Sequence, residues 1–217
     1  MSLLIALPGV IIVLGQAMSV LQALGMLQAI LGVQVLLAIP FITKNAQGYL
    51  ARAFEFSRQF LFKWTVNWRF VGEEYFLSTQ FSTILLAGNL ALLALFVSTR
   101  WTAPSALSIL ALVRRVFRPL PLQVERDISS RVTPDFVATT ILTSLAIGMF
   151  CARSLHYQFY AYIAWTTPFL LWKSGLHGLL IYAIWAVQEW AWNVYPSSNA
   201  SSITVVLCLA VQVFGVW

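Results

Sequence analysis

The residues of this sequence best suited to chemistry stand together just before an apolar, aromatic segment. A guanidinium and an imidazole, from Arg153 and His156, can hold a phosphate, while Tyr157 and Gln158 can bind hydroxyl groups. In a helix, the two cations would share one stripe with Tyr157 and Tyr160. Charged side chains at the mouth of a membrane segment usually mark either a site or an interfacial anchor, and both interpretations stay open here.

A second group of aromatic and basic residues occupies the stretch 54–70, where Asn67 adds an amide. One interpretation is an interfacial helix with an aromatic belt and snorkelling cations. The other is a site for an anionic lipid, in which rings lie against the hydrocarbon chain while cations and Asn67 hold a phosphate. The candidate binding residues of this cluster are Arg58, Lys63, Trp64, Asn67, Trp68 and Arg69.

Carboxylates that could act as a general base are scarce near these clusters. Glu73 and Glu74 follow the aromatic stretch, but ordinary loop charges or salt bridges explain them better than catalysis. Glu189 lies near the end of an apolar segment and is left undecided between packing and a site. The sequence has no Gly-x-Ser-x-Gly or His-Glu-x-x-His motif. Cys151 and Cys208 are isolated and form no metal motif, so no metal is expected.

The composition places these clusters in a membrane protein. The 217 residues are 60% hydrophobic and 9% charged, whereas soluble domains carry about a quarter charged residues. Long, continuous apolar segments favour helices over a β-barrel. The sequence therefore predicts an all-α, polytopic transmembrane helix bundle that forms a single membrane domain over residues 1–217. About seven spans are expected, at 3–14, 20–42, 81–97, 135–150, 157–172, 178–192 and 203–217.

Two long loops set the expected orientation. The loop 98–134 carries six arginines against two carboxylates, which places it in the cytosol by the positive-inside rule. Its apolar part, 105–117, predicts an interfacial helix. The loop 43–80 is nearly balanced in charge and is expected on the opposite, lumenal side, with its aromatic and basic segment at the interface. The positive-inside rule explains the net charge of +6, because the basic residues lie in loops between apolar segments. Nucleic-acid binding is therefore not expected.

Alternation of the spans brings the stretch 153–157 to the lumenal side, together with the loop 193–202. This second loop carries Asn199-Ala-Ser201, a glycosylation sequon. The position of this sequon agrees with the orientation that the charge rule predicts. Both polar and aromatic clusters are thus predicted on one membrane face.

Several sequence strings carry a resemblance to one protein family. They are Phe56-Ser-Arg-Gln-Phe60, Trp64-Thr-Val-Asn-Trp-Arg-Phe70 with Glu74, Ala152-Arg-Ser-Leu-His-Tyr-Gln-Phe159, Pro168-Phe-Leu-Leu-Trp172 and Glu189-Trp-Ala-Trp-Asn-Val-Tyr-Pro196. In this order they resemble the dolichyl-phosphate-mannose-dependent α-1,3-mannosyltransferases of asparagine-linked glycosylation. The resemblance covers most of the chain and is weakest in the loop 98–134 and the N-terminal spans.

The resemblance implies a multi-pass protein of the endoplasmic reticulum membrane with a partial glycosyltransferase C-type fold and a lumenal active face. The family moves mannose from dolichyl phosphate mannose to Man5GlcNAc2-PP-dolichol, with inversion. No cofactor is implied beyond the donor lipid, and the partners are the two lipid-linked substrates and membrane lipid. An inverting transfer needs a base and a counter-charge for the departing phosphate. The residues expected to offset that charge are Arg58, Lys63, Arg69, Arg153 and His156.

The chain is expected to be the C-terminal half of such an enzyme, with the base in the other half, so that it does not transfer mannose alone. Two alternatives are weighed against this interpretation. One is a non-catalytic, truncated membrane protein of the same family. The other is a small transporter, which is disfavoured because the polar clusters lie at one membrane face and no matching pair of broken helices is present.

Overall fold

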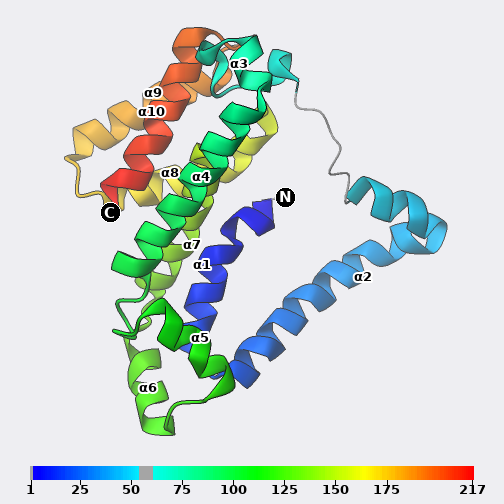
Figure 1. Ribbon diagram of the computed structural model, residues 1–217. Helices are drawn as coiled ribbons and strands as arrows, with labels where there is room; N and C mark the ends of the chain where they lie inside the picture. The colour runs from blue at the N-terminus through cyan, green and yellow to red at the C-terminus, as the bar shows by residue number, and fades with distance from the viewer. Residues whose placement is uncertain (1, 54–60) are drawn as a thin grey trace.

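The computed structural model describes residues 2–53 and 61–217, and these residues form helices and turns without β-strands. This confirms the all-α prediction. Six apolar helices pack together, with α7 at the centre in contact with α1, α4, α8 and α10, while α2 lies apart from them (Figure 1). The bounds of these helices are α1 Ser2–Ala17, α2 Val20–Ala53, α4 Thr79–Phe96, α7 Pro134–Phe150, α8 Tyr160–Lys173, α9 Gly178–Asn193 and α10 Asn199–Gly215.

Shorter elements gather at the two ends of this bundle (Figure 1). One end holds α3 (Glu73–Leu77) and the 3₁₀ turns η1 (Phe62–Trp64), η2 (Arg69–Val71) and η4 (Tyr157–Phe159). The opposite end holds the π turn η3 (Val97–Trp101) and two helices, α5 (Ile109–Phe117) and α6 (Leu122–Arg131). The helix predicted in 105–117 is therefore present as α5, and the loops 43–80 and 98–134 contribute to opposite ends.

The contact between α1 and α7 depends on small residues. A Cβ atom at Gly9 would lie 2.8 Å from the carbonyl oxygen of Thr140, so only glycine lets the helices approach this closely. The amide of Gly9 donates to Ser144 Oγ at 3.2 Å, and the same hydroxyl donates to the carbonyl of Ile5 at 3.2 Å. The hydroxyl of Ser144 thus bridges the amide of Gly9 and the carbonyl of Ile5, which an α-helix normally joins directly. Gly9 is the residue that follows Pro8, which has no amide hydrogen of its own.

A buried set of three polar side chains joins α8, α9 and α10. Gln188 Nε2 donates to Thr167 Oγ1 at 2.7 Å, and Gln212 Nε2 donates to Gln188 Oε1 at 2.7 Å. Thr167 Oγ1 also lies 3.1 Å from Gln212 Oε1. Each side chain is almost fully buried, and each finds its partners inside the bundle, as polar groups away from water must. These hydrogen bonds fix the register of the three helices.

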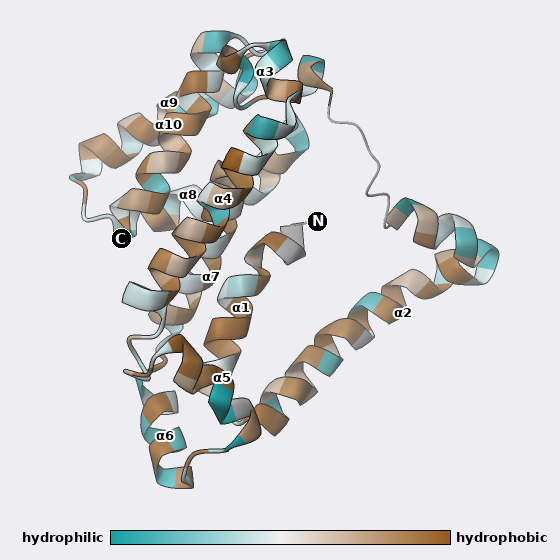
Figure 2. Cartoon of the chain, in the orientation of Figure 1, coloured by the Kyte–Doolittle hydropathy of each residue, from teal (hydrophilic) through white to brown (hydrophobic). Residues whose placement is uncertain are grey.

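The number of membrane spans is smaller than predicted when helix length is applied strictly. Among the described residues, α2 and the stretch Thr79–Trp101 are long and apolar enough to cross a bilayer, and hydrophobic residues dominate both (Figure 2). A third span results if α6 and α7, which are bent by 73°, count as one broken span. Each predicted segment coincides with a helix, but α1, α8, α9 and α10 have only 14 to 17 residues, short of the ~20 that a typical span needs. Seven spans are therefore not confirmed.

Helix α2 also extends beyond its predicted end. It continues from the expected span 20–42 to Ala53, with a break in the helical backbone at Asn45. The side-chain oxygen of Asn45 accepts the amide of Gly48 at 2.8 Å, as the side chain of a helix N-cap residue does. The first part of the loop 43–80 is therefore helical, because Asn45 ends one helical stretch and caps the start of the next.

Candidate functional site

The two clusters singled out in the sequence lie side by side at the α3 end of the bundle. The amide of Val66 donates to the carbonyl of Leu155 at 2.8 Å. Asn67, fully buried beside it, donates from Nδ2 to the carbonyl of Ala152 at 2.6 Å and accepts the amide of Leu155 on Oδ1 at 2.7 Å. Both the nitrogen and the oxygen of its carboxamide thus form hydrogen bonds with backbone groups. Asn67 therefore joins the two segments, and its part in phosphate binding stays a prediction.

Trp68 makes the sharp turn that follows this contact. Its φ of 54° lies in the left-handed region, which a bulky residue occupies only when its surroundings hold it there. Its ring packs against the rings of Phe81 on α4 and Phe150 at the end of α7, with centroids 5.8 and 6.1 Å away. The indole nitrogen is buried without a hydrogen-bond partner. The described part of the aromatic stretch, residues 61–70, is therefore folded into the bundle end as turns instead of forming a separate interfacial helix.

The two described cations of this cluster lie over aromatic rings. Arg69 Cζ is 5.0 Å from the ring centroid of Phe62, and Lys63 Nζ is 5.0 Å from that of Trp64. The amide of Arg69 donates to Ser202 Oγ on α10 at 2.7 Å, while one terminal guanidinium nitrogen is buried without a hydrogen-bond partner. Both cations are held near one end of the bundle by cation–π contacts. The predicted site residue Arg58 lies outside the described residues.

Arg153 contacts α4. Its Nη1 donates to Ser82 Oγ at 2.7 Å. Arg153 and Ser82 form the polar end of a hollow of about 330 Å³, which Leu85 and Leu86 of α4 line on the apolar side. Asn89 and Cys151 complete the lining. A positive charge beside the apolar side chains of Leu85 and Leu86 suits an anionic head group with a hydrocarbon tail.

The predicted helical stripe through Arg153, His156, Tyr157 and Tyr160 is wrong. Residues 151–156 form a turn, η4 follows, and α8 begins only at Tyr160 instead of at 157. The backbone of this turn is held by Val66 and Asn67, and those hydrogen bonds replace the ones a helix would need. Arg153, Tyr157 and Tyr160 consequently have different partners: Ser82 on α4, Val194 just after α9 and Glu189 on α9.

Tyr157 and His156 occupy the second half of this turn. The Tyr157 hydroxyl donates to the carbonyl of Val194, just after α9, at 2.7 Å. Burial raises the pKa of the Tyr157 phenol. The carbonyl of His156 accepts the amide of Phe159, which closes η4, and the side chain of Gln158 is exposed.

A line of rings connects the two clusters across their exposed side. The ring of Trp64 stacks on Tyr195 at 6.4 Å, and Tyr195 meets Tyr157 edge-on at 5.6 Å. Lys63, over the Trp64 ring, ends this line. Tyr195 was not among the predicted site residues. Its place within the string Glu189–Pro196 was the sequence signal that could have identified it.

The carboxylates at the α3 end of the bundle lie at a helix N-terminus or form a hydrogen bond between helices. Glu73 and Glu74 are exposed in the first turn of α3, where the helix dipole favours negative charge. Glu189 Oε1 accepts a hydrogen bond from the Tyr160 hydroxyl, which ties α9 to the start of α8. Within the described part of the chain, no group of three His, Cys, Asp or Glu side chains is close enough to hold a metal ion.

The sequon lies in the first turn of α10. Asn199 is the first helical residue and is exposed, whereas Ser201 is fully buried. Ser198 and Ser201 form a capping box: the Ser201 amide donates to Ser198 Oγ at 3.1 Å, and the Ser198 amide donates to Ser201 Oγ at 2.9 Å. The hydroxyl of the sequon therefore stabilises the helix start.

Comparison with known proteins decides the family of this chain. The profile of a family described as "ALG3 protein" matches residues 1–202. The chain belongs to the ALG3 protein family. A relative from Neurospora crassa is 52% identical over 223 residues, which cover 100% of this chain and 50% of the relative. A human relative is 42% identical over 190 residues, covering 84% of this chain and 41% of its own length.

A third relative of this ALG3 family member, from Cryptococcus neoformans, is 36% identical over 224 residues, covering 100% of this chain and 49% of the relative. All three bear the name "Dol-P-Man:Man(5)GlcNAc(2)-PP-Dol alpha-1,3-mannosyltransferase". The chain spans about half the length of the curated relatives it matches. No solved structure matches it.

Sequence reasoning missed several residues that build this candidate site. Ser82 orients Arg153, Ser202 holds the Arg69 backbone, and Ser197 Oγ donates to the carbonyl of Thr65 at 2.6 Å. All three are serines on segments distant in sequence from the cluster that each one supports. No local pattern distinguishes them from other serines of apolar helices and loops.

Proposed function

We propose that this ALG3 family chain forms the substrate-binding part of a mannosyltransferase. In this proposal the whole enzyme moves mannose from dolichyl phosphate mannose to Man5GlcNAc2-PP-dolichol in α-1,3 linkage. The observation that carries it is the placement of Arg153 at the polar end of the groove beside α4. The names of the relatives supply the substrates, and the groove supplies a fitting place for a polyprenyl phosphate.

The chemistry follows from the charges. The donor is a β-linked mannosyl phosphate and the product is α-linked, so the acceptor hydroxyl attacks the anomeric carbon as the dolichyl phosphate departs. The leaving group gains a second negative charge, which a guanidinium can offset without a metal. Because Ser82 already orients Arg153, little reorganisation is needed as that charge develops.

The other site residues have supporting roles in this proposal. Arg69 and Lys63, held over rings at the same end of the bundle, add positive potential for the pyrophosphate of the acceptor lipid. The aromatic line from Trp64 through Tyr195 to Tyr157 offers flat faces on which sugar rings can rest. His156 and Gln158, on the same turn, offer further donors and acceptors.

The base is assigned to the part of the enzyme that this chain does not span. Glu73 and Glu74 lie in the first turn of α3, and Glu189 accepts from Tyr160, so the settings of all three are explained without catalysis. The chain alone is then expected to bind donor lipid but not to transfer mannose. A non-catalytic member of the same family is the second candidate, and the same absence of an assigned base favours it.

The proposal includes a location and an orientation. The chain is one membrane domain of the endoplasmic reticulum with about seven spans, arranged as part of a glycosyltransferase C-type fold. The end with α3, the loop 43–80 and the sequon faces the lumen, and the basic loop 98–134 faces the cytosol. The opposite placement of α3 and α5 in Figure 1 supports this orientation.

The test uses a chimera in which this chain replaces the matching half of the Neurospora crassa relative. In cells that lack the α-1,3-mannosyltransferase, the chimera should consume the Man5 lipid-linked oligosaccharide. Arg153→Gln should weaken dolichyl phosphate mannose binding roughly 10- to 100-fold, since a charge-assisted contact is lost. Arg131→Gln, at the opposite end, is the matched control. Unchanged donor affinity and transfer in Arg153→Gln would refute the role, whereas an inactive chimera that still binds donor would favour the non-catalytic member.

A further inference from the structure

Helix α5 carries an apolar stripe that faces away from the protein. Ile109, Leu110, Val113 and Phe117 fall on one side of the helix, and their exposed fractions are 43%, 58%, 52% and 81%. The opposite side packs inward through Arg115, which is only 3% exposed. An amphipathic helix of a water-soluble region would be turned the other way, so this stripe requires an apolar environment outside the chain.

The place of α5 in the fold identifies that environment as lipid. The helix begins eight residues after Trp101, the last residue of the Thr79–Trp101 membrane-spanning stretch, whose surface is also largely exposed. Figure 2 shows α5 at the end of the bundle where α4 and α1 both terminate. The exposed stripe therefore continues the lipid-facing surface of α4 at the level of the bilayer interface.

Positive charge borders this stripe. Arg114 and Arg118 are exposed at the C-terminal end of α5, and α6 adds Arg126. Arg126 lines a hollow of about 760 Å³ between α6 and the turn from α1 to α2. Met18, Met26 and Leu122 form apolar parts of its wall. Glu125 also lines this hollow, but its charge is offset by Arg115 at 3.2 Å. The remaining cation, Arg126, and the apolar walls suit the head group of an anionic lipid.

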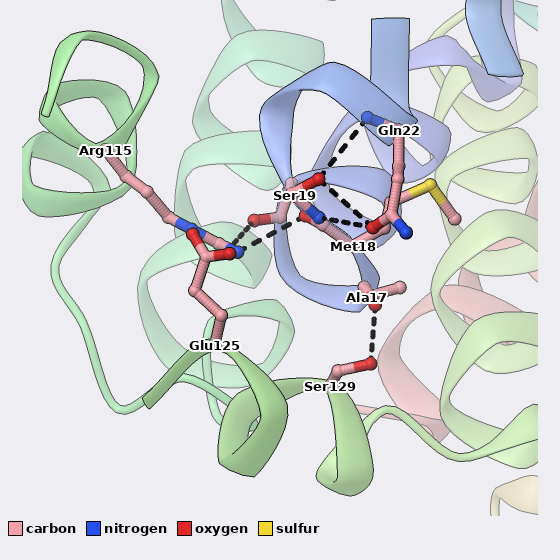
Figure 3. A network of polar contacts seen from close by, with 8 residues as sticks. Ala17, Met18, Ser19, Gln22, Arg115, Glu125 and Ser129 are labelled. Atoms are coloured by element: carbon pink, nitrogen blue, oxygen red, sulfur yellow. Dashed lines mark hydrogen bonds and ion pairs between the residues drawn. The ribbon is translucent and has the colours of Figure 1, made fainter. Parts of the chain in front are cut away.

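The elbow formed by α5 and α6 is held rigidly against the bundle. Arg115 donates to the carbonyls of Gly15 and Met18 at 2.5 and 3.3 Å and to Glu125 Oε1 at 3.2 Å (Figure 3). Ser129 Oγ donates to the carbonyl of Ala17 at 2.6 Å. These bonds satisfy the carbonyls of Gly15 and Ala17 in the last turn of α1 and that of Met18 just after it. The charge of Glu125 is compensated internally, and the outward-facing charges of α5 are positive.

From these observations we infer that the α5–α6 elbow, Ile109–Arg131, is an anionic-phospholipid binding surface. The α5 stripe inserts into the adjacent leaflet, and Arg114, Arg118 and Arg126 hold the phosphates of anionic head groups. The inference concerns the end of the bundle opposite to Arg153 and does not depend on the proposed transfer activity.

The depth of α5 in a bilayer tests the first part. In a Cys151→Ala/Cys208→Ala background, single nitroxide labels are placed at Val113→Cys and Phe117→Cys, with Gln123→Cys on exposed α6 as the control. The chain is reconstituted in phosphatidylcholine bilayers. The first two labels should collide with oxygen more than with a water-soluble nickel chelate, and the control label should show the reverse. Water access at Val113 and Phe117, or shielding from both reagents by a protein partner, would overturn the inference.

Retention of lipid tests the second part. The chain is extracted from bilayers of equal parts phosphatidylcholine and phosphatidylinositol, and bound phosphatidylinositol is counted by native mass spectrometry. Arg114→Gln/Arg126→Gln should lower its association roughly fivefold for each arginine removed, and high salt should do the same to the unmodified chain. Lys44→Gln/Arg52→Gln removes equal charge from α2 and should retain the lipid. Equal retention by the two double variants would refute the binding surface, provided that both keep the label depths of the parent chain.

Discussion

The Oδ1 atom of Asn67 lies 2.7 Å from the backbone nitrogen of Leu155, 88 residues further along the chain. With the bond from Nδ2 to the Ala152 carbonyl, this one carboxamide sets the conformation of the turn that carries Arg153 and His156. The site is therefore assembled by a buried polar contact between two irregular segments. Regular helix packing alone would leave the turn without a defined shape.

Replacing Asn67 tests this relationship. Asn67→Ala should lower the free energy of unfolding by about 2–4 kcal/mol, because the Leu155 amide and the Ala152 carbonyl lose buried partners. Denaturation in mixed detergent micelles, followed by tryptophan fluorescence, measures the loss. Asn193→Ala is the control, since its exposed amide donates to the Glu189 carbonyl and its removal should change stability by less than about 0.5 kcal/mol. Similar losses for both variants would contradict the role of Asn67.

Hydropathy located the apolar helices of the bundle, whereas tertiary contacts determine the conformation of the candidate site. The apolar segments near 81–97, 135–150 and 178–192 follow from composition, because a bundle in lipid leaves no alternative to helices. The start of α8 was placed three residues early, since periodicity cannot show that Leu155 is held by Asn67. Asn67 was selected for phosphate binding, which stays a prediction, and its contact with Leu155 was not foreseen.

The partners of Arg153 and Arg69 were invisible for a related reason. Ser82 lies 71 residues from Arg153 and accepts a hydrogen bond from its guanidinium, and Ser202 lies 133 residues from Arg69 and accepts one from its backbone amide. A serine in an apolar helix commonly bonds the carbonyl one turn earlier, so its type and spacing carry no long-range signal. Only the packing of α4 and α10 against the irregular segments reveals these contacts.

The close approach of α1 and α7 gives a second prediction. Gly9→Ala should destabilise the bundle by roughly 1–3 kcal/mol, because the new Cβ would lie 2.8 Å from the backbone oxygen of Thr140, which cannot rotate away. Gly88→Ala is the control on α4, where a Cβ meets nothing within 4 Å. That variant should be neutral or more stable, by up to about 1 kcal/mol, since alanine favours the helix. Thermal unfolding of both variants in the same detergent measures the difference in stability. Destabilisation by Gly88→Ala but not by Gly9→Ala would contradict the prediction.

Two ion pairs at the ends of helices are expected to differ in strength. Arg115→Gln should cost about 3–5 kcal/mol, because it leaves Glu125 and the α1 carbonyls without their buried partner. Lys173→Gln should cost less than about 1 kcal/mol, because Lys173 pairs with Asp135 at an exposed position, 2.8 Å apart. Unfolding at low and high salt distinguishes them, since salt should weaken only the exposed pair. A salt-sensitive Arg115 contribution would contradict its burial.

The raised pKa of the Tyr157 phenol leads to a prediction about the free energy of unfolding at high pH. Burial raises its pKa above the ordinary value of 10.0, so the folded state keeps the proton more tightly than the unfolded state. Its contribution to stability is complete below about pH 10 and is lost as the pH rises through the folded pKa. Tyr157→Phe should remove this part of the alkaline decline, whereas the exposed Tyr182→Phe should leave it in place. The measurement is the free energy of unfolding from neutral to strongly alkaline pH, and parallel curves for the two variants would contradict the prediction.

The position of Ser201 leads to a prediction about modification. An acceptor sequon must offer its asparagine and hydroxyl together, but here Ser201 is buried in the first turn of α10 and bonded to Ser198. The folded chain should therefore stay unmodified at Asn199. Ser201→Ala should cost about 1 kcal/mol through loss of the capping box, while Asn199→Gln, which also destroys the sequon, should be nearly neutral. Mobility before and after endoglycosidase treatment, measured beside thermal stability, separates the two roles. A mobility shift that both variants abolish would show that the sequon is modified before α10 forms, and equal stability of the variants would show that the hydroxyl does not cap the helix.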